Sequence, residues 1–312
     1  MPQKNLVSYN SFISGLTRHG SYEEAVKLFR VMQKGCGGFM LDEFTLGSIV
    51  GCCSCLGNVK WLQVHGVAVI VGFHSNVILN NALIDGYGKC GEPDASFHLF
   101  SSMFEKDVLS WTSMVVAYTR ASRIDDACKV FDEMPIKNMV SWTVLITSFA
   151  KNGRCYKALE AFRGMIEEGV MLSAQTFVSV LDACASEALI GKGKQVHCQI
   201  IRGRNIGNLF NVYVCNSLID MYAKCGDMKS NENLFEIIHV RDVVSWNTLI
   251  TGFAQNGCGE DSLVLFSRMV EASIEPNRVT FLGVLSAWNH AGLVNEGLEL
   301  LDSMERRYGV KA

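Results

Sequence analysis

The chain has 312 residues, of which 49% are hydrophobic and 19% charged, so an intrinsically disordered protein is excluded and a buried interior is expected. The formal net charge of −3 gives no general basic surface of the kind that nucleic-acid-binding domains usually carry, although basic residues confined to one groove would still allow such binding. The longest apolar stretch, 67–73, is far too short to cross a bilayer, so no membrane partner is expected.

A short signature recurs along the chain and predicts a helical repeat. It reads Leu6-Val-Ser-Tyr-Asn10, then Met139-Val-Ser-Trp-Thr143, then Val243-Val-Ser-Trp-Asn247. About ten residues after each copy a glycine separates two amphipathic stretches. These glycines are Gly20, Gly153 and Gly257. A fixed period of this kind indicates a stack of two-helix units that has no single core.

The segment 243–277 shows the pattern clearly. Apolar residues recur at i, i+3, i+4 and i+7 from Trp246 and predict a first helix with one buried face. Gly257 is free to take the positive φ of a tight reversal. A second apolar stripe follows in 263–270, and Pro276 ends the unit because proline cannot continue a helix. One such hairpin is too small to be stable alone, so its neighbours must bury both stripes.

Alignment on the central glycine divides the chain into nine units, in which Ser122 and Ala188 replace the glycine twice. The units are 6–42, 43–76, 77–107, 108–138, 139–173, 174–211, 212–242, 243–277 and 278–312. Residues 1–5 match 134–138, the end of an internal unit, and are interpreted as the tail of a preceding repeat. The predicted fold is all-α: a right-handed α-α superhelix, or solenoid, of helix-turn-helix repeats without strands.

The lengths of the units define at least three sub-types. Units 77–107, 108–138 and 212–242 have 31 residues, and the others have 34 to 38. Units 43–76 and 174–211 also share a distinctive second helix, with Leu62-Gln-Val-His65 matching Lys194-Gln-Val-His197. Matching cysteines, such as Cys90 with Cys225 and Cys53 with Cys184, favour small buried thiols packed between helices over disulfides.

These features resemble plant pentatricopeptide repeat (PPR) proteins of the PLS subclass. The resemblance rests on the Val-Val-Ser-Trp-Asn opening, on Ile219-Asp-Met-Tyr-Ala-Lys-Cys-Gly226, on Gly193-Lys-Gln-Val-His197 and on the mixed unit lengths. In the terms of that family the units read P, L, S, S, P, L, S, P, L. Tetratricopeptide arrays are the competing interpretation, but they keep a uniform 34-residue period. The chain is then expected to be an internal fragment, without the transit peptide and the C-terminal E/DYW extensions.

The resemblance implies sequence-specific binding of single-stranded RNA at one base per repeat. In the family, the fifth and last residues of a unit together select the base. Here the pairs for uracil are Asn10/Asp42, Asn81/Asp107 and Asn216/Asp242; Thr112/Asn138 favours adenine, Asn247/Asn277 a pyrimidine, more often cytosine, and Thr143/Ser173 weakly a purine. The alternative is that asparagine at a helix start only caps the helix.

The fifth residues of the L-type units are Gly47, Val178 and Leu282, which offer a base no side-chain hydrogen bond. The resemblance implies that these units bind partner proteins, such as the multiple-organelle editing factors, or space the RNA. The expected target is therefore 5′-U-N-U-A-R-N-U-Y-N-3′.

Two further positions are expected to face RNA. The second residue of each unit flanks a base in the family, and here it is apolar or aromatic in all P- and S-type units: Val7, Ile78, Leu109, Val140, Tyr213 and Val244. The L-type units carry Phe44, Gln175 and Val279 there. Contact with a base face contributes about 1–3 kcal/mol for aromatic platforms. The alternative is that these residues pack between helices.

The thirteenth residue is basic in five of the six P- and S-type units, with Gln255 as the exception. These residues are Arg18, Lys89, Arg120, Lys151 and Lys224, and they are expected to contact phosphates. The alternative is a solvated cation that interacts with the negative end of the helix dipole.

No catalytic site is expected. A cytidine deaminase domain, which full-length members of the subclass often carry, needs His-x-Glu and Cys-x-x-Cys motifs to hold zinc. No histidine here is followed two residues later by glutamate, and the Cys-x-x-Cys spacing within 52–55 lies in a repeat helix without a second ligand pair. We expect neither a metal nor a cofactor.

The sequence thus predicts a non-enzymatic RNA-recognition module of a mitochondrion or chloroplast, directing RNA processing, most naturally C-to-U editing. The alternative function is a protein-interaction scaffold within an organellar RNA-processing complex, suggested by the acidic net charge and by the L-type units.

Overall fold

The computed structural model describes residues 6–35, 42–55, 75–202, 211–291 and 304. Over these ranges the regular structure consists of sixteen α-helices, and no strand occurs among them. The expected tail 1–5, the Leu62–His65 segment and nearly all of the last second helix lie outside the described residues. The all-helical prediction is confirmed for the part of the chain that the structure describes.

The first helix of every expected unit begins at the first residue of that unit. These helices are α1 (Leu6–Arg18), α3 (Glu43–Cys55), α5 (Val77–Lys89), α7 (Val108–Arg120), α9 (Met139–Lys151), α11 (Ala174–Ser186), α14 (Val212–Lys224), α16 (Val243–Gln255) and α18 (Arg278–Ala291). The second helices are α2 (Tyr22–Gly35), α6 (Pro93–Ser102), α8 (Ile124–Glu133), α10 (Cys155–Glu167), α12 (Ile190–Arg202), α15 (Met228–Ile237) and α17 (Gly259–Glu271).

The difference in unit length lies in the second helix. This helix has 10 residues in α6, α8 and α15, the second helices of the three 31-residue units. It has 13 or 14 residues in α2, α10, α12 and α17. The short units therefore lack about one helical turn on that side only.

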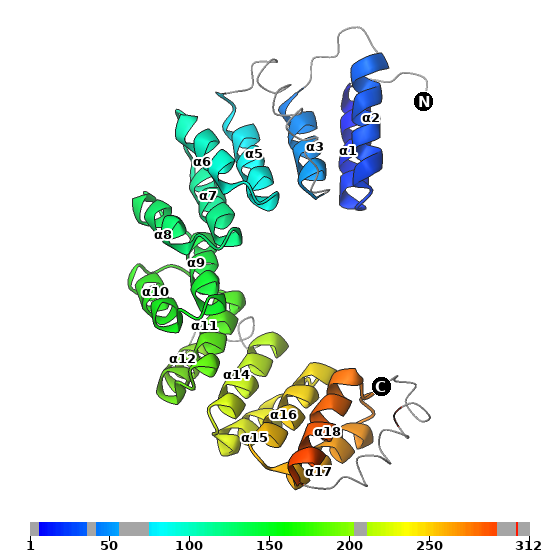
Figure 1. Ribbon diagram of the computed structural model, residues 1–312, viewed down its shortest axis with the longest axis vertical. Coiled ribbons are helices and arrows are strands. Elements are labelled where there is room, and N and C mark those ends of the chain that lie inside the picture. Colours follow the sequence, from blue (N-terminus) through cyan, green and yellow to red (C-terminus); the bar gives the residue numbers. More distant parts are fainter. Residues whose placement is uncertain (1–5, 36–41, 56–74, 203–210, 292–303, 305–312) are drawn as a thin grey trace. The chain divides into compact units, whose positions relative to one another are not determined.

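The chain forms two compact units, 1–148 and 149–312, each of which is a stack of hairpins. In the first, α1, α3, α5 and α7 contact one another in chain order, with the second helices packed beside them (Figure 1). In the second unit, α11, α14, α16 and α18 form the corresponding row and α10, α12, α15 and α17 pack against it. First helices therefore share one layer within each unit, and their opening residues recur along it.

An aromatic contact joins each second helix to the following first helix. Trp111, Trp142 and Trp246 are each the fourth residue of their helix, and each meets a phenylalanine of the preceding hairpin edge-on, at centroid distances of 4.7 to 4.9 Å. The phenylalanines are Phe100, Phe131 and Phe235, and Lys106, Lys137 and Arg241 lie over the same rings. Such pairs contribute about 0.5–1.5 kcal/mol beyond the buried area. They recur because each hairpin needs its neighbour to cover it.

Two units without the turn glycine adopt the same turn. Ser122 and Ala188 have φ of 59° and 50°, close to the values of Gly91 and Gly153 at the equivalent position. The Ala188 N–H bonds to the Ala185 carbonyl and the Leu189 N–H to the Cys184 carbonyl, at 3.2 and 2.8 Å. This hydrogen-bond pattern satisfies the carbonyls at the helix end without glycine. The left-handed conformation costs alanine about 1–2 kcal/mol, so packing imposes the turn at this position.

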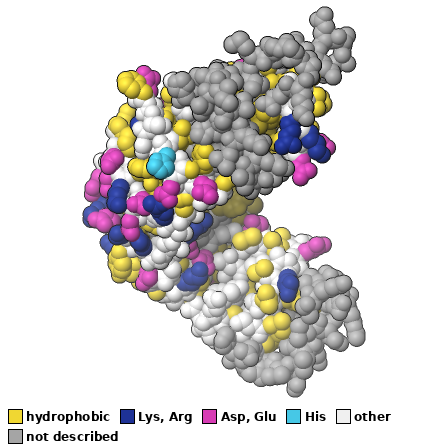
Figure 2. All heavy atoms as spheres, turned by 45° about the horizontal axis from the view of Figure 1, so that its top comes forward, with side chains coloured by type: hydrophobic (Ala, Val, Ile, Leu, Met, Phe, Trp, Pro, Cys, Tyr) yellow, Lys and Arg dark blue, Asp and Glu magenta, His cyan; other side chains and the backbone are white. Residues whose placement is uncertain are grey.

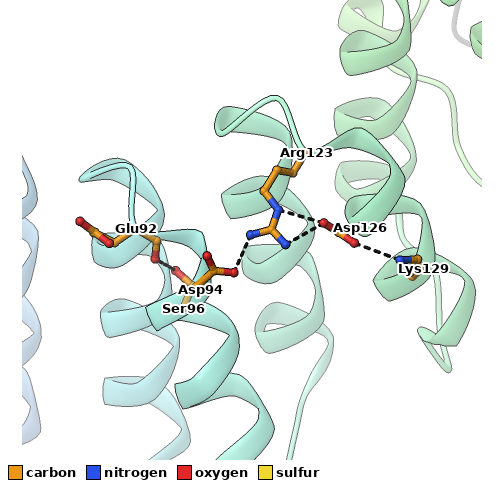
Figure 3. A network of polar contacts seen from close by, with 6 residues as sticks. All are labelled: Glu92, Asp94, Ser96, Arg123, Asp126 and Lys129. Carbon is orange, nitrogen blue, oxygen red and sulfur yellow. Dashed lines mark hydrogen bonds and ion pairs between the residues drawn. The ribbon is translucent and has the colours of Figure 1, made fainter.

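Arg123 connects two successive second helices through a polar network. Its guanidinium pairs with Asp94 of α6 and, at 2.8 Å, with Asp126 of α8, which also accepts from Lys129 at 3.1 Å (Figure 3). The same guanidinium lies 4.9 Å from the centroid of the Tyr118 ring. Because these groups are largely exposed, the network orients the helix ends more than it stabilises them.

The cysteines at matching repeat positions pack as expected and form no disulfide among the described residues. Cys184 is fully buried, and burial raises its pKa to about 12. Cys90 and Cys225 are half-buried free thiols. These side chains therefore act as small apolar groups.

The fourth residue of each second helix is buried and small in six of seven cases: Ala25, Ser96, Ala127, Ala158, Gly193 and Ser262. The two serines donate to the carbonyls of Ile84 and Ile250, each at 3.0 Å. Asn231 is the exception, because its amide nitrogen and oxygen are both buried without a hydrogen-bond partner. An unsatisfied buried polar group of this kind costs about 1–3 kcal/mol. Asn231 is therefore a weak point of the second unit.

Asn231→Ser is expected to stabilise the protein by about 1 kcal/mol, because it removes the unpaired amide and provides a hydroxyl for the Ile219 carbonyl. Urea denaturation followed by circular dichroism measures the change. The reciprocal variant Ser262→Asn should lower the denaturation midpoint. Equal midpoints for Asn231→Ser and the wild type would contradict the interpretation.

Candidate nucleic-acid interface

The last residue of each unit caps the first helix of the next unit. Asp107, for example, accepts from the backbone N–H of Ser110 at 2.7 Å, and Asp242 accepts from that of Ser245 at 2.8 Å. The same bond is made by Asp42, Asn76, Asn138, Ser173, Asn211 and Asn277. This explains why helices begin where the units do, since each cap satisfies an N–H that the helix leaves free.

The capping alternative for the fifth residue is wrong. That residue lies one turn inside the first helix, whereas the residue before the helix is the cap. A sequence signal for the real cap was present in the Asp-x-x-Ser spacing of 107–110 and 242–245, which is that of a capping box. The fifth residue is therefore free for another role.

In four of the six expected base-selecting pairs, the fifth residue donates its side-chain amide to the last residue. The Nδ2-to-oxygen distances are 2.8 Å for Asn10–Asp42, 3.0 Å for Asn81–Asp107, 3.3 Å for Asn216–Asp242 and 3.1 Å for Asn247–Asn277. The structure thus brings together residues that lie 26 to 32 positions apart in the sequence. Each pair is a fixed combination of donor and acceptor groups beside the start of a helix.

The two pairs with threonine differ. The Thr112 hydroxyl donates back to the Val108 carbonyl at 2.7 Å, and within the described part of the chain no bond joins it to Asn138. Thr143 is half-buried in α9, and Ser173 caps α11. These residues therefore present a hydroxyl and a cap without an amide between them.

The second residues of the units are exposed, and this excludes the inter-helix packing alternative. The exposed fractions are 70% for Val7, 66% for Ile78, 59% for Leu109, 48% for Val140, 73% for Tyr213 and 51% for Val244. Phe44 and Val279 of the L-type units are equally exposed. An apolar side chain thus projects into solvent one turn before each fifth residue, on the same helix.

The expected phosphate-binding cations are partly neutralised by aspartates that sequence reasoning missed. Asp85 pairs with Lys89 at 2.5 Å and with Arg120 at 3.0 Å, and Asp220 pairs with Lys224 at 2.8 Å. Both aspartates are the ninth residue of their unit, and their i, i+4 spacing to lysine was the available signal. Arg18 and Lys151 are exposed and form no ion pair with any other described residue. On the face that Figure 2 shows, acidic and basic side chains are interspersed.

The carboxylates that cap helices are held ionised. Burial would raise the pKa of Asp107 and Asp242, but hydrogen bonds from Ser110 and Ser245 and from the paired asparagine outweigh it, so both pKa values are lowered. The pKa of Asp42 is lowered in the same way by Thr45 and Asn10. Each pair therefore keeps a full negative charge at neutral pH.

A group with a lowered pKa contributes stability above its unfolded value, near 4, and loses it as the pH falls through the folded value. We expect the denaturation midpoint to fall from about pH 4 downwards. The triple variant Asp42→Asn/Asp107→Asn/Asp242→Asn retains good caps but loses the carboxylates. It should lose less stability than the wild type between pH 7 and pH 3 in urea denaturation, and an equal loss would contradict this assignment.

Over the described residues, no group of three histidine, cysteine or acidic side chains is placed to hold a metal ion. His197, one of the matching histidines, contacts the Tyr222 hydroxyl through Nδ1 at 2.8 Å, and burial lowers its pKa. None of the described helices is long and apolar enough to span a bilayer.

Tandem hairpins that repeat a side-chain pair at each helix start define a helical-repeat protein. Two family models, described as PPR repeat family and PPR repeat, match residues 4–54, 137–186 and 241–288 and residues 81–108, 109–139, 213–242 and 279–308. Together these segments cover most of the chain. The protein therefore belongs to the pentatricopeptide repeat family.

Relatives and solved structures agree with this assignment. A pentatricopeptide repeat-containing protein of Arabidopsis thaliana is 44% identical over 315 residues, which cover 99% of this chain and 45% of the relative. Two others from the same plant, named chloroplastic and mitochondrial, are 30% and 34% identical over 99% of this chain and 34% and 33% of their own length. The chain thus spans less than half the length of these relatives.

The crystal structure of PPR10 from maize matches 97% of this chain and 44% of its own, with a TM-score of 0.77 and 19% identity. A second crystal structure, of PPR10 in complex with an 18-nt psaJ RNA element, has a TM-score of 0.73 over 98% of this chain and 46% of its own, with 20% identity. The fold is that of a pentatricopeptide repeat array.

Proposed function

We propose that the chain binds single-stranded RNA and reads one base per P- or S-type unit. The observation that carries this proposal is the recurrent, hydrogen-bonded pair of fifth and last residues, with an exposed apolar second residue on the same helix. A base stacked on the second residue would present its edge to the pair. The structure of PPR10 with an RNA element supports RNA as the ligand of this fold.

The proposed target is 5′-U-N-U-A-R-N-U-Y-N-3′, with uracil at Asn10/Asp42, Asn81/Asp107 and Asn216/Asp242. The pair chemistry is compatible with uracil, because an asparagine amide offers both a donor and an acceptor to a base edge. Threonine at 112 and 143 offers one hydroxyl and is assigned to purines. The P, L and S sub-types proposed for the units leave 43–76, 174–211 and 278–312 without a defined base.

The proposed setting is a mitochondrion or a chloroplast, as the names of two relatives suggest. The bound transcript would be positioned for processing, with C-to-U editing by a separate catalytic domain or partner as the favoured outcome. The L-type units would contact editing factors, because Leu282 is an exposed apolar side chain at the position where other units carry a polar fifth residue.

Asn81→Thr is expected to move the preference at the third nucleotide from uracil towards guanine. The change is about tenfold in relative affinity if one hydrogen bond worth ~1.4 kcal/mol exchanges its partner. Fluorescence anisotropy with four RNAs that differ only at this nucleotide measures it. Asn76→Ser is the matched control, because it changes a cap whose unit has Gly47 as fifth residue. An unchanged preference in Asn81→Thr would contradict the register.

Asp85→Asn should strengthen RNA binding and its dependence on salt, because it releases Lys89 and Arg120 from their shared carboxylate. The slope of log affinity against log salt should steepen by about 0.7 for each cation that gains a phosphate. Asp94→Asn changes the net charge equally but frees Arg123 on the second-helix side. Equal slopes for both variants would show that the thirteenth residues do not contact phosphates.

The protein-scaffold alternative predicts weak RNA binding that does not depend on sequence. The nonamer and its complement, titrated at moderate salt, separate the two functions. Equal affinities for both RNAs would overturn the proposed function.

A further inference from the structure

The side chains around the fifth-residue asparagines follow two different arrangements. The third residue of the following unit is threonine after Asn10 and Asn247, and serine after Asn81 and Asn216. These are Thr45, Thr280, Ser110 and Ser245, all of them fully buried. Each stands next to a pair already described, but its hydroxyl takes a different acceptor in the two arrangements.

In the threonine arrangement, the asparagine amide is fully bonded within the protein. The Thr280 hydroxyl donates to Asn247 Oδ1 at 2.6 Å and accepts from the backbone N–H of Asn277 at 3.0 Å. The Thr45 hydroxyl makes the same short bond to Asn10 Oδ1. Since Asn10 Nδ2 is bonded to Asp42 and Asn247 Nδ2 to Asn277, both ends of each amide have partners.

In the serine arrangement, the carbonyl end of the amide has no partner. The Ser110 hydroxyl donates to Asp107 Oδ1 at 2.9 Å, and the Ser245 hydroxyl donates to Asp242 Oδ1 at 2.9 Å. The oxygens Asn81 Oδ1 and Asn216 Oδ1 are buried and accept no hydrogen bond from any described residue. The residues themselves are 3% and 8% exposed.

The direction of each amide is fixed by its neighbour. A carboxylate only accepts, so the asparagine turns its NH₂ towards Asp107 or Asp242 and its oxygen away from it. In the serine arrangement the cap also accepts all of its printed bonds through Oδ1, whereas Asp42 uses both oxygens. Serine therefore leaves acceptors on both members of the pair, and threonine leaves neither the amide oxygen nor the second carboxylate oxygen of Asp42.

We propose that the third residue of the following unit is a positioning residue that sets how strictly the fifth-residue asparagine distinguishes uracil from cytosine. Uracil presents N3–H where cytosine presents a bare nitrogen, so only an available acceptor separates the two. With serine, Asn81 and Asn216 gain a hydrogen bond from uracil alone. With threonine, the oxygens of Asn10 and Asn247 are already occupied, and these units tolerate both pyrimidines. This inference rests on the proposed RNA binding.

The test is a pair of reciprocal exchanges in the 312-residue chain, with anisotropy measured on nonamers carrying uracil or cytosine at one nucleotide. Ser245→Thr should lower the uracil-to-cytosine affinity ratio at the seventh nucleotide by roughly tenfold, the worth of one buried hydrogen bond. Thr280→Ser should raise the ratio at the eighth nucleotide. Ser110→Thr repeats the first exchange at the third nucleotide, in case the added methyl group at 245 disturbs folding.

Ser141→Thr is the matched control, because it makes the same exchange beside Thr112, which has no amide. Its uracil-to-cytosine ratio should stay unchanged at the fourth nucleotide. If the nonamer binds and the reciprocal exchanges leave the ratios unaltered, the inference is wrong while RNA binding stands. If neither the nonamer nor its complement is bound by the wild type, the proposed function itself fails.

Discussion

The array depends on one shared residue at each junction between hairpins. The last residue of a unit caps the next first helix, and in four units it also accepts the amide of its own fifth residue. The cap fixes where the helix begins, and the amide bond fixes which side chain lies beside it. Because both bonds meet on one carboxylate or amide, the start of each helix and the surface next to it are set together.

The remaining interactions place these junctions in a row within each compact unit. The edge-to-face contact of Trp111 with Phe100 brings a second helix against the following first helix, and it recurs at Trp142 and Trp246. The exposed second residues then project from equivalent positions. Asp85 and Asp220 neutralise nearby cations, so the surface holds a balance of charge rather than a continuous basic stripe. Recognition on such a surface would rely on local hydrogen bonds and stacking more than on long-range attraction.

The sequence predicted the nine first helices to the residue, because the opening signature and the 3.6-residue stripe recur at each of them. It also predicted which residues would meet, as the bond between Asn10 and Asp42 shows. It did not predict that Asp42 is a cap, because the fifth residue was taken as the helix start. The choice of acceptor by Thr280 or Ser245 was beyond prediction, since it depends on rotamers and distances within a junction. The unpaired amide of Asn231 has no sequence signal at all.

The double role of the last residue limits the vocabulary open to evolution and to protein engineers. Residues that start helices well are few, chiefly aspartate, asparagine, serine and threonine. The residues found here at that position are all aspartate, asparagine or serine. A substitution chosen only to suit a different nucleotide would also have to nucleate the neighbouring helix. The set of messages that such an array can spell is therefore bounded by the thermodynamics of helix initiation.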